Sequence, residues 1–149
     1  MTYEPAAPEN LRDIYNVVQR TIKTVYPKYY PAEVVDFFCG LHNTGAIAED
    51  IATGSVGILR ADGSIVATGC FRDKHITRVY VLPDYQKKGL GTLIIKNIEG
   101  QIGEAHDTIY LDVSLPAVQL YEKLGFRTVK HERYLVENGA VLVYEVTLN

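Results

Sequence analysis

A short glycine-punctuated segment carries the residue types that bind an anion. Gln86 is followed by Lys87 and Lys88, and then by Gly89 and Gly91. An apolar strand pattern precedes this segment, and a helical pattern follows it. Glycines let the backbone approach oxygen atoms closely, and the free N–H groups and macrodipole of a helix N-terminus favour negative charge. The segment therefore predicts a diphosphate site, to which the two lysines add positive charge.

Two common phosphate-binding loops do not fit this segment. A dinucleotide fingerprint requires another glycine three residues after Gly91, where the chain has Ile94. A nucleoside-triphosphate loop requires Gly-Lys-Ser or Gly-Lys-Thr, and neither tripeptide occurs in the sequence. What remains is the pattern Gln-x-x-Gly-x-Gly between a strand and a helix.

A second motif lies downstream, in the run AVQLYEKLGF from Ala117 to Phe126. Leu120 and Leu124 are one helical turn apart and share a face. Gly125 suits the left-handed conformation that ends many helices. The run predicts a short amphipathic helix that stops at this glycine.

Together the two motifs resemble those of the GNAT superfamily of acyl-CoA-dependent N-acetyltransferases. The resemblance extends from about Glu49 to Val146. It implies acetyl-CoA as cosubstrate, with the pyrophosphate in the glycine turn and the pantetheine arm paired to the preceding strand. The implied contacts come from Val79, Tyr80, Val81, Gln86, Lys87, Lys88, Gly89, Leu90, Gly91, Thr92, Ser114 and Tyr121.

The resemblance also assigns chemistry to single groups. The Val81 N–H is the expected donor to the thioester carbonyl, because a main-chain donor can stabilise developing negative charge. Tyr121 matches the tyrosine that in many members protonates the departing thiolate, and an ordinary tyrosine pKa of about 10 keeps it protonated at neutral pH. A packing role is the alternative for Tyr121. Ser114 replaces the asparagine of many members, so its contact to the pantetheine arm is direct, through a water, or lost.

The group that removes the amine proton is open at this stage. His75 lies six residues before Val81 on one predicted strand, and strand alternation would place both side chains on the same face. Its ordinary pKa near 6.5 suits a base. Glu49, Asp50, Asp73 and a water chain are the alternatives.

Periodicity predicts the elements that must position these residues. The expected order is a helix over 11–25, a helix over 32–41, strands over 55–60, 64–71 and 76–82, a helix over 91–102, a strand over 108–113, the Tyr121 helix, and strands over 127–136 and 141–147. Asp62-Gly63 and Asn138-Gly139 are hairpin turn signals that require antiparallel neighbours, whereas the strand-helix-strand passages permit parallel ones. The predicted fold is α/β (mixed α+β) and GNAT-like, with a mixed, mostly antiparallel sheet of about six to seven strands flanked by about four helices. In the family, the strands over 76–82 and 108–113 splay apart around the cofactor.

Composition limits the remaining classes. The 149 residues fit a single domain over 1–149, and 47% hydrophobic with 22% charged residues is ordinary for a globular protein. A net charge of −3 argues against a nucleic-acid partner, and the sequence lacks an apolar run of membrane-spanning length. A cytoplasmic location is expected. Cys39 and Cys70 have no metal-site or disulfide spacing, so no metal is expected and both are interpreted as free thiols.

The predicted function is transfer of an acetyl group from acetyl-CoA to a primary amine of a small molecule or peptide, by direct attack in a ternary complex. The alternative is a non-catalytic acyl-CoA-binding sensor or interaction module. Tyr26, Tyr29 and Tyr30 form a proline-bounded cluster that either lines the acceptor entrance or packs a helix against a loop. His42, His106 and His131 are interpreted as structural, and a homodimer is compatible with the resemblance.

Overall fold

The computed structural model describes residues 1–133 and 140–147. Its helices and strands are β1 (Glu4–Pro5), α1 (Leu11–Val25), α2 (Ala32–Leu41), α3 (Thr44–Ala52), β2 (Val56–Ala61), β3 (Ser64–Arg72), β4 (His75–Val81), α4 (Leu90–Gly103), β5 (Thr108–Val113), α5 (Val118–Lys123), β6 (Arg127–Arg133) and β7 (Ala140–Thr147). Short 3-10 turns connect them at η1 (Pro8–Asn10), η2 (Tyr26–Lys28), η3 (Pro83–Tyr85) and η4 (Leu115–Ala117).

The strands form one mixed sheet in the order β1-β2-β3-β4-β5-β7-β6. Every neighbouring pair is antiparallel except β4 and β5, which are parallel. The predicted mixed, mostly antiparallel sheet flanked by helices is confirmed. β7 lies between β5 and β6, so the strand-helix-strand passage through α5 does not produce parallel neighbours. The Asn138-Gly139 turn lies outside the described residues.

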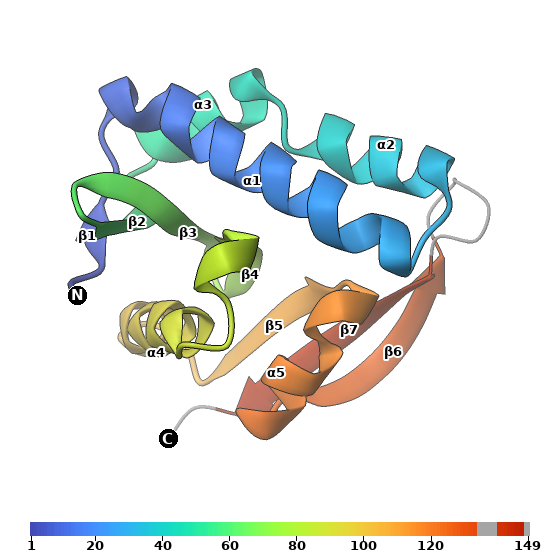
Figure 1. Cartoon of the computed structure of the whole chain (residues 1–149). Coiled ribbons are helices and arrows are strands. Elements are labelled where there is room, and N and C mark those ends of the chain that lie inside the picture. Colours follow the sequence, from blue (N-terminus) through green and yellow to red (C-terminus); the bar gives the residue numbers. More distant parts are fainter. Residues whose placement is uncertain (134–139, 148–149) are drawn as a thin grey trace.

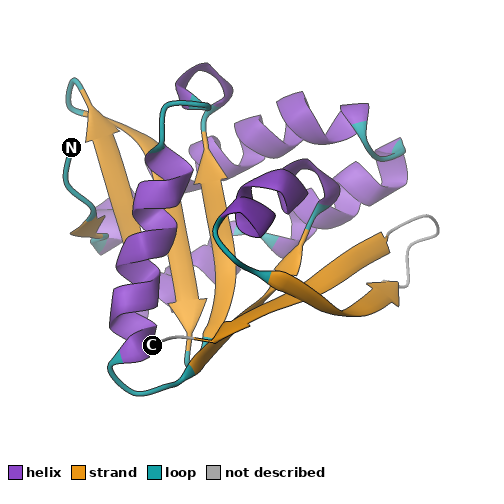
Figure 2. Cartoon of the chain, turned by 90° about the horizontal axis from the view of Figure 1, so that it is seen from below, coloured by secondary structure: helices purple, strands orange, loops and turns teal. Residues whose placement is uncertain are grey.

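Helices cover both faces of the sheet (Figure 1). α1, α2 and α3 lie over one face, and α4 lies against the other, as the view from below also shows (Figure 2). The apolar stripe of α1, which includes Ile14, Val18 and Ile22, is fully buried against β2–β4. α4 buries a corresponding isoleucine row, Ile94, Ile95, Ile98 and Ile102, on the opposite face. No helix in the described part of the chain is both long and apolar enough to span a membrane.

Helix α3 was not predicted from the sequence. Asn43 caps its first turn, because the Asn43 side chain accepts a hydrogen bond from the Ala46 N–H at 2.9 Å. Thr44 and Gly45 have low intrinsic helix propensity and obscure this start. Ile47 and Ile51 are buried against α1, so tertiary packing stabilises the helix.

The sheet opens between β4 and β5. These strands pair only at His75 with Tyr110 and at Ile76 with Leu111, so the rest of β4 has no β5 partner. The two halves of the sheet diverge from this point (Figure 2). This is the splay that the resemblance implied, and it leaves a backbone edge free in the middle of the sheet.

Candidate active site

The free edge of β4 presents main-chain donors to the opening. The Leu82 N–H donates to the Val66 carbonyl of β3 at 2.9 Å. Because donors alternate in direction along an antiparallel strand, the N–H groups of Val79 and Val81 point away from β3 and toward the opening. An extended ligand arm can pair with this edge as an added strand would.

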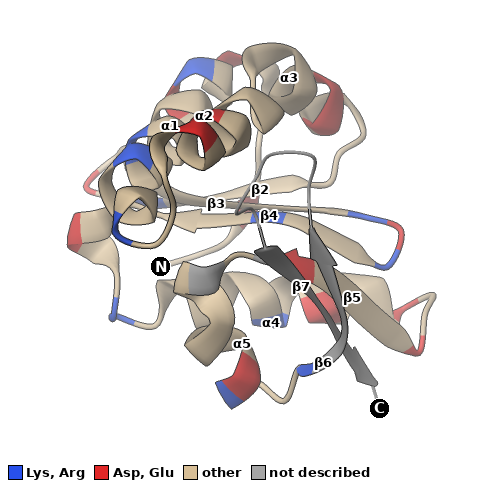
Figure 3. Cartoon of the chain, turned by 90° about the vertical axis from the view of Figure 1, so that its right-hand side faces the viewer, with Lys and Arg blue, Asp and Glu red and all other residues tan. Residues whose placement is uncertain are grey.

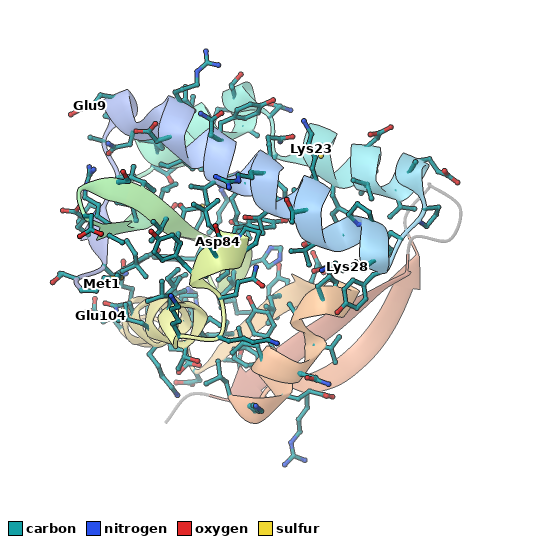
Figure 4. All side chains as sticks on the ribbon, in the orientation of Figure 1. Met1, Glu9, Lys23, Lys28, Asp84 and Glu104 are labelled. Carbon is teal, nitrogen blue, oxygen red and sulfur yellow. The ribbon has the colours of Figure 1, made fainter. Side chains whose placement is uncertain are left out.

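The turn after β4 has the backbone geometry that the predicted anion site requires. Lys87 and Gly89 both adopt left-handed backbone conformations, with φ of 62° and 84°. The Leu93 N–H donates to the Gly89 carbonyl at 3.0 Å, which is the first helical bond of α4. The N–H groups of residues 90–92 precede that bond and have no helical acceptor, so they are available to an anion. Asp84, labelled in Figure 4, lies on η3 just before this turn.

The two sequence motifs meet at the start of α4. A Cβ on Gly91 would lie 3.1 Å from Cδ2 of Leu120, so α5 packs closely against the first turn of α4. Glycine at this position permits that approach. Gln86 turns back toward β4, and its Nε2 donates to the Val81 carbonyl at 2.9 Å.

A cavity of about 1590 Å³ joins the anion turn, the opening between β4 and β5, and the ends of α1 and α2. The sequence-predicted site residues that line it are His75, Val79, Tyr80, Val81, Gln86, Lys87, Gly89, Leu90, Gly91, Thr92, Ser114 and Tyr121. Lys88 is not among the lining residues, and its ammonium lies over the Tyr85 ring, 5.4 Å from the centroid. Acidic and basic residues are interspersed over the side drawn in Figure 3.

Three hydroxyl groups form a chain across the opening. Tyr26 in η2 donates to the Tyr80 hydroxyl at 3.3 Å, and the Tyr26 and Ser114 hydroxyls are 2.9 Å apart. Burial raises the pKa of Tyr26, although its two hydroxyl partners oppose that rise. The Ser114 hydroxyl is therefore already hydrogen-bonded to Tyr26, which lies across the opening.

Tyr121 lies at the same opening on α5. It is buried, and its ring packs edge-on against Phe126 at 5.5 Å between centroids. Burial raises the pKa of Tyr121 above its ordinary value, and nearby Tyr26 adds to the rise. The phenol therefore stays protonated through the neutral range and can act only as a proton donor there.

A family model described as "Acetyltransferase (GNAT) domain" matches residues 25–144. The chain belongs to the GNAT acetyltransferase family. It is thereby an acyltransferase domain of the acetyl-CoA-dependent type.

Individual relatives agree with this assignment to the GNAT family. An N-alpha-acetyltransferase from Sulfurisphaera tokodaii is 33% identical over 70 residues, which are 44% of this chain and 42% of that protein. A GCN5-related N-acetyltransferase structure from Rhodopseudomonas palustris superposes with a TM-score of 0.89 at 20% identity, covering 99% of this chain and 95% of that one. The PaiA N-acetyltransferase of Thermoplasma acidophilum, solved in complex with coenzyme A, superposes with a TM-score of 0.77 at 16% identity, with 99% of each chain covered. At these identities the structural likeness shows the fold.

The predicted placement of His75 on the same face of β4 as Val81 was wrong. His75 and Val81 do not share a face of β4, because the register with β3 shifts between Cys70 and Phe71 and inserts an extra residue into β4. Val81 pairs with Ala67, and both belong to the core on the α4 side of the sheet. His75 pairs with Arg72, whose side chain binds Asp50 of α3 on the opposite side. His75 still lines the cavity.

The other candidates for the base differ in their surroundings. Both carboxylate oxygens of Asp50 are ion-paired, one to Arg72 at 2.8 Å and the other to Arg78 at 2.9 Å, which removes Asp50 as a free base. Glu49 is exposed and does not line the cavity, whereas Asp73 does. A group that the sequence analysis missed is Asp112 of β5, whose Oδ2 lies 3.4 Å from His75 Nε2.

The three tyrosines of the proline-bounded cluster have separate positions. Tyr30 is buried and packs against Phe38, whereas Tyr26 and the half-exposed Tyr29 line the cavity. Arg78 was also missed. Arg78 is one of the alternate residues of β4 whose side chains are buried, like Tyr80. A charged residue at such a position indicates a buried group of opposite charge or a hydrogen-bond acceptor.

Proposed function

We propose that this GNAT domain transfers the acetyl group of acetyl-CoA to a primary amine by direct attack in a ternary complex. The observation that carries the proposal is the pair of β4 N–H groups at Val79 and Val81, which face the opening in the same cavity as the anion turn and Tyr121. Coenzyme A has the matching order of groups: a pyrophosphate, an extended amide-bearing arm and a terminal thioester.

The residues divide the reaction between them. The free N–H groups of residues 90–92 hold the pyrophosphate, and the β4 edge pairs with the pantetheine amides. The Val81 N–H polarises the thioester carbonyl. The amine nitrogen forms the new C–N bond as the C–S bond breaks, and Tyr121 gives its proton to the departing thiolate. His75, in contact with Asp112, or a water takes the proton that the amine loses.

Direct transfer is favoured over an acyl-enzyme because neither Cys39 nor Cys70 lines the cavity. Initial rates measured over a grid of acetyl-CoA and amine concentrations should give intersecting double-reciprocal lines. Parallel lines would indicate a covalent intermediate and would contradict this step.

The test of the function is release of free thiol from acetyl-CoA in the presence of amines. The panel should contain alkylamines, polyamines, amino acids and peptides with free N-termini. Peptides are included because the Sulfurisphaera relative is named an N-alpha-acetyltransferase. Thiol release with at least one amine supports the proposal. Saturable acetyl-CoA binding without thiol release from any amine would favour the sensor alternative.

A further inference from the structure

His42 is held in place from three directions beside β4. It follows α2, and its carbonyl accepts a hydrogen bond from Gln19 Nε2 at 3.1 Å. Its ring packs edge-on against Tyr80, with 5.4 Å between centroids. Its third contact is to Arg78 on the same strand as Tyr80. His42 lines the cavity and is only 7% exposed, so its ring has one fixed orientation there.

The contact with Arg78 fixes which ring nitrogen of His42 carries the proton. Arg78 Nε lies 3.1 Å from His42 Nδ1. An arginine N–H can only donate, so Nδ1 must accept and the single proton of the neutral ring sits on Nε2. Burial, together with the charge of Arg78, lowers the pKa of His42 to about 3, which keeps the ring neutral. The Nε2–H is a donor without a partner among the described residues.

Arg78 adds positive charge behind this donor. Its side chain is 3% exposed, and its Nη2 binds Asp50 at 2.9 Å. Asp50 also binds Arg72, so one carboxylate faces two guanidinium groups and the cluster retains a net positive charge. Arg78 Nη1 is buried without a hydrogen-bond partner among the described residues. Such unsatisfied donors raise the gain from any acceptor oxygen that reaches the cluster.

We propose that His42 Nε2–H, backed by Arg78, binds an oxygen on the carbon next to the amine-bearing carbon of the acceptor. This rests on the proposed function and narrows its substrate to α-amino carbonyl compounds. The His42 ring contacts Tyr80 and Arg78, so its donor lies over the part of β4 where the N–H groups of Val79 and Val81 face the opening. An amine presented to the thioester would then have its neighbouring carbonyl within reach of the histidine. Simple alkylamines lack that oxygen.

The test compares alaninamide with isopropylamine, in which a methyl group replaces the carboxamide. We expect the wild-type protein to favour alaninamide in kcat/KM expressed on the free amine. His42→Phe keeps an aromatic ring but loses the donor, and it should reduce this preference about tenfold, the value of one hydrogen bond to a polar group. The ratio between variant and wild type cancels the different basicities of the two amines. His42→Gln retains an N–H near the Nε2 position and should keep most of the preference.

The controls separate a local effect from unfolding. His106→Gln changes another cavity histidine and should leave the preference unaltered. Melting temperature and acetyl-CoA affinity confirm that each variant is folded. Alanine is the third acceptor: a rate above that of alaninamide indicates a free amino acid as the natural class, and a lower rate indicates a peptide N-terminus.

Two results would overturn the inference while the proposed function stands. One is an equal kcat/KM of the wild-type protein for isopropylamine and alaninamide, a measurement that requires no variant. The other is an unchanged preference in folded His42→Phe. Absence of thiol release with every amine would instead overturn the proposed function and this inference with it.

Discussion

At the scale of single residues, Tyr121 should matter for turnover rather than for binding. Its phenol is buried beside Phe126 and Tyr26, and burial raises its pKa further above the neutral range, so it is protonated at neutral pH. Removing a general acid lowers a rate by roughly 10²–10⁴-fold. Tyr121→Phe should therefore lower kcat by about this factor and leave the acetyl-CoA dissociation constant little changed, as measured by thiol release and calorimetry.

A matched control for Tyr121→Phe is Tyr15→Phe. Tyr15 lies on α1, is partly buried in the core and does not line the cavity. Its substitution should leave both kcat and affinity at the wild-type value. A full rate in Tyr121→Phe would remove this tyrosine as the acid and leave it a packing role.

A negative charge introduced at Gly89 tests whether the turn after β4 binds the pyrophosphate. The φ of +84° at Gly89 is left-handed and nothing lies within 4 Å of an added Cβ, so a side chain there is strained but meets no neighbour. Gly89→Asp adds a negative charge beside the proposed pyrophosphate, and repulsion of about 1.4 kcal/mol already weakens binding tenfold. We expect the acetyl-CoA dissociation constant to rise at least about tenfold.

Gly54 offers the comparison for Gly89 because it has φ +80° and equally open surroundings, in the loop between α3 and β2. Gly54→Asp carries the same backbone strain without a nearby anion site. Equal loss of affinity in the two variants would show that strain, rather than charge at the turn, is responsible.

At the scale of elements, local sequence pattern predicted most of the strands and helices around the proposed cofactor half of the site. The strand over 108–113 and the helix after Gly89 were placed to within a residue or so, because alternation, helical spacing and glycine turns are written in neighbouring residues. The extra residue in β4 was not visible. A bulge is set by the register with β3, which depends on distant residues, and it reversed the face assigned to His75.

The contact between β3 and α4 depends on the absence of a side chain at Gly69. An added Cβ there would collide with Ile94 of α4, and it would lie 2.7 Å from the Tyr3 hydroxyl and 3.1 Å from Ile98 Cδ1. Overpacking of a close-packed core costs about 1–3 kcal/mol. Gly69→Ala should lower the free energy of unfolding by that amount in urea titrations.

The converse substitution lies on the same helix. Gly100 is exposed within α4, and an added Cβ there meets nothing within 4 Å. Gly100→Ala should stabilise the protein by about 0.5–1 kcal/mol, because alanine has the higher helix propensity. The free energy of unfolding lost in Gly69→Ala should exceed the change in Gly100→Ala. If it does not, α4 can shift away from the sheet at little cost.

At the scale of the whole molecule, the proposed acceptor half of the cavity is assembled from segments far apart in the chain. His42 comes from the end of α2, Asp50 from α3 and Arg78 from β4, and each looks unremarkable in its own stretch of sequence. Only the packing of three helices over one face of the sheet brings them together. For this reason local sequence patterns pointed only to the proposed cofactor residues, and His42 was interpreted as structural.

This assembly gives the stability of the whole protein a specific dependence on pH. Folding lowers the pKa of His42 from 6.5 to about 3. Between these values the unfolded chain binds a proton at His42 that the folded chain does not, so the free energy of unfolding falls as pH drops below 6.5. Above pH 6.5 both states are neutral at this residue and its contribution is constant. On going from pH 7.5 to pH 5, this effect of His42 alone should lower the free energy of unfolding by about 2 kcal/mol.

His42→Gln removes this titration and leaves the carboxylates of the chain in place. Urea unfolding at pH 7.5 and pH 5 should therefore show a smaller acid loss in His42→Gln than in the wild-type protein, by about 2 kcal/mol. The difference between the two proteins cancels the acid sensitivity that they share. An equal loss in both would mean that His42 is protonated in the folded state at pH 5, and an imidazolium there could not accept the Arg78 hydrogen bond that orients its ring.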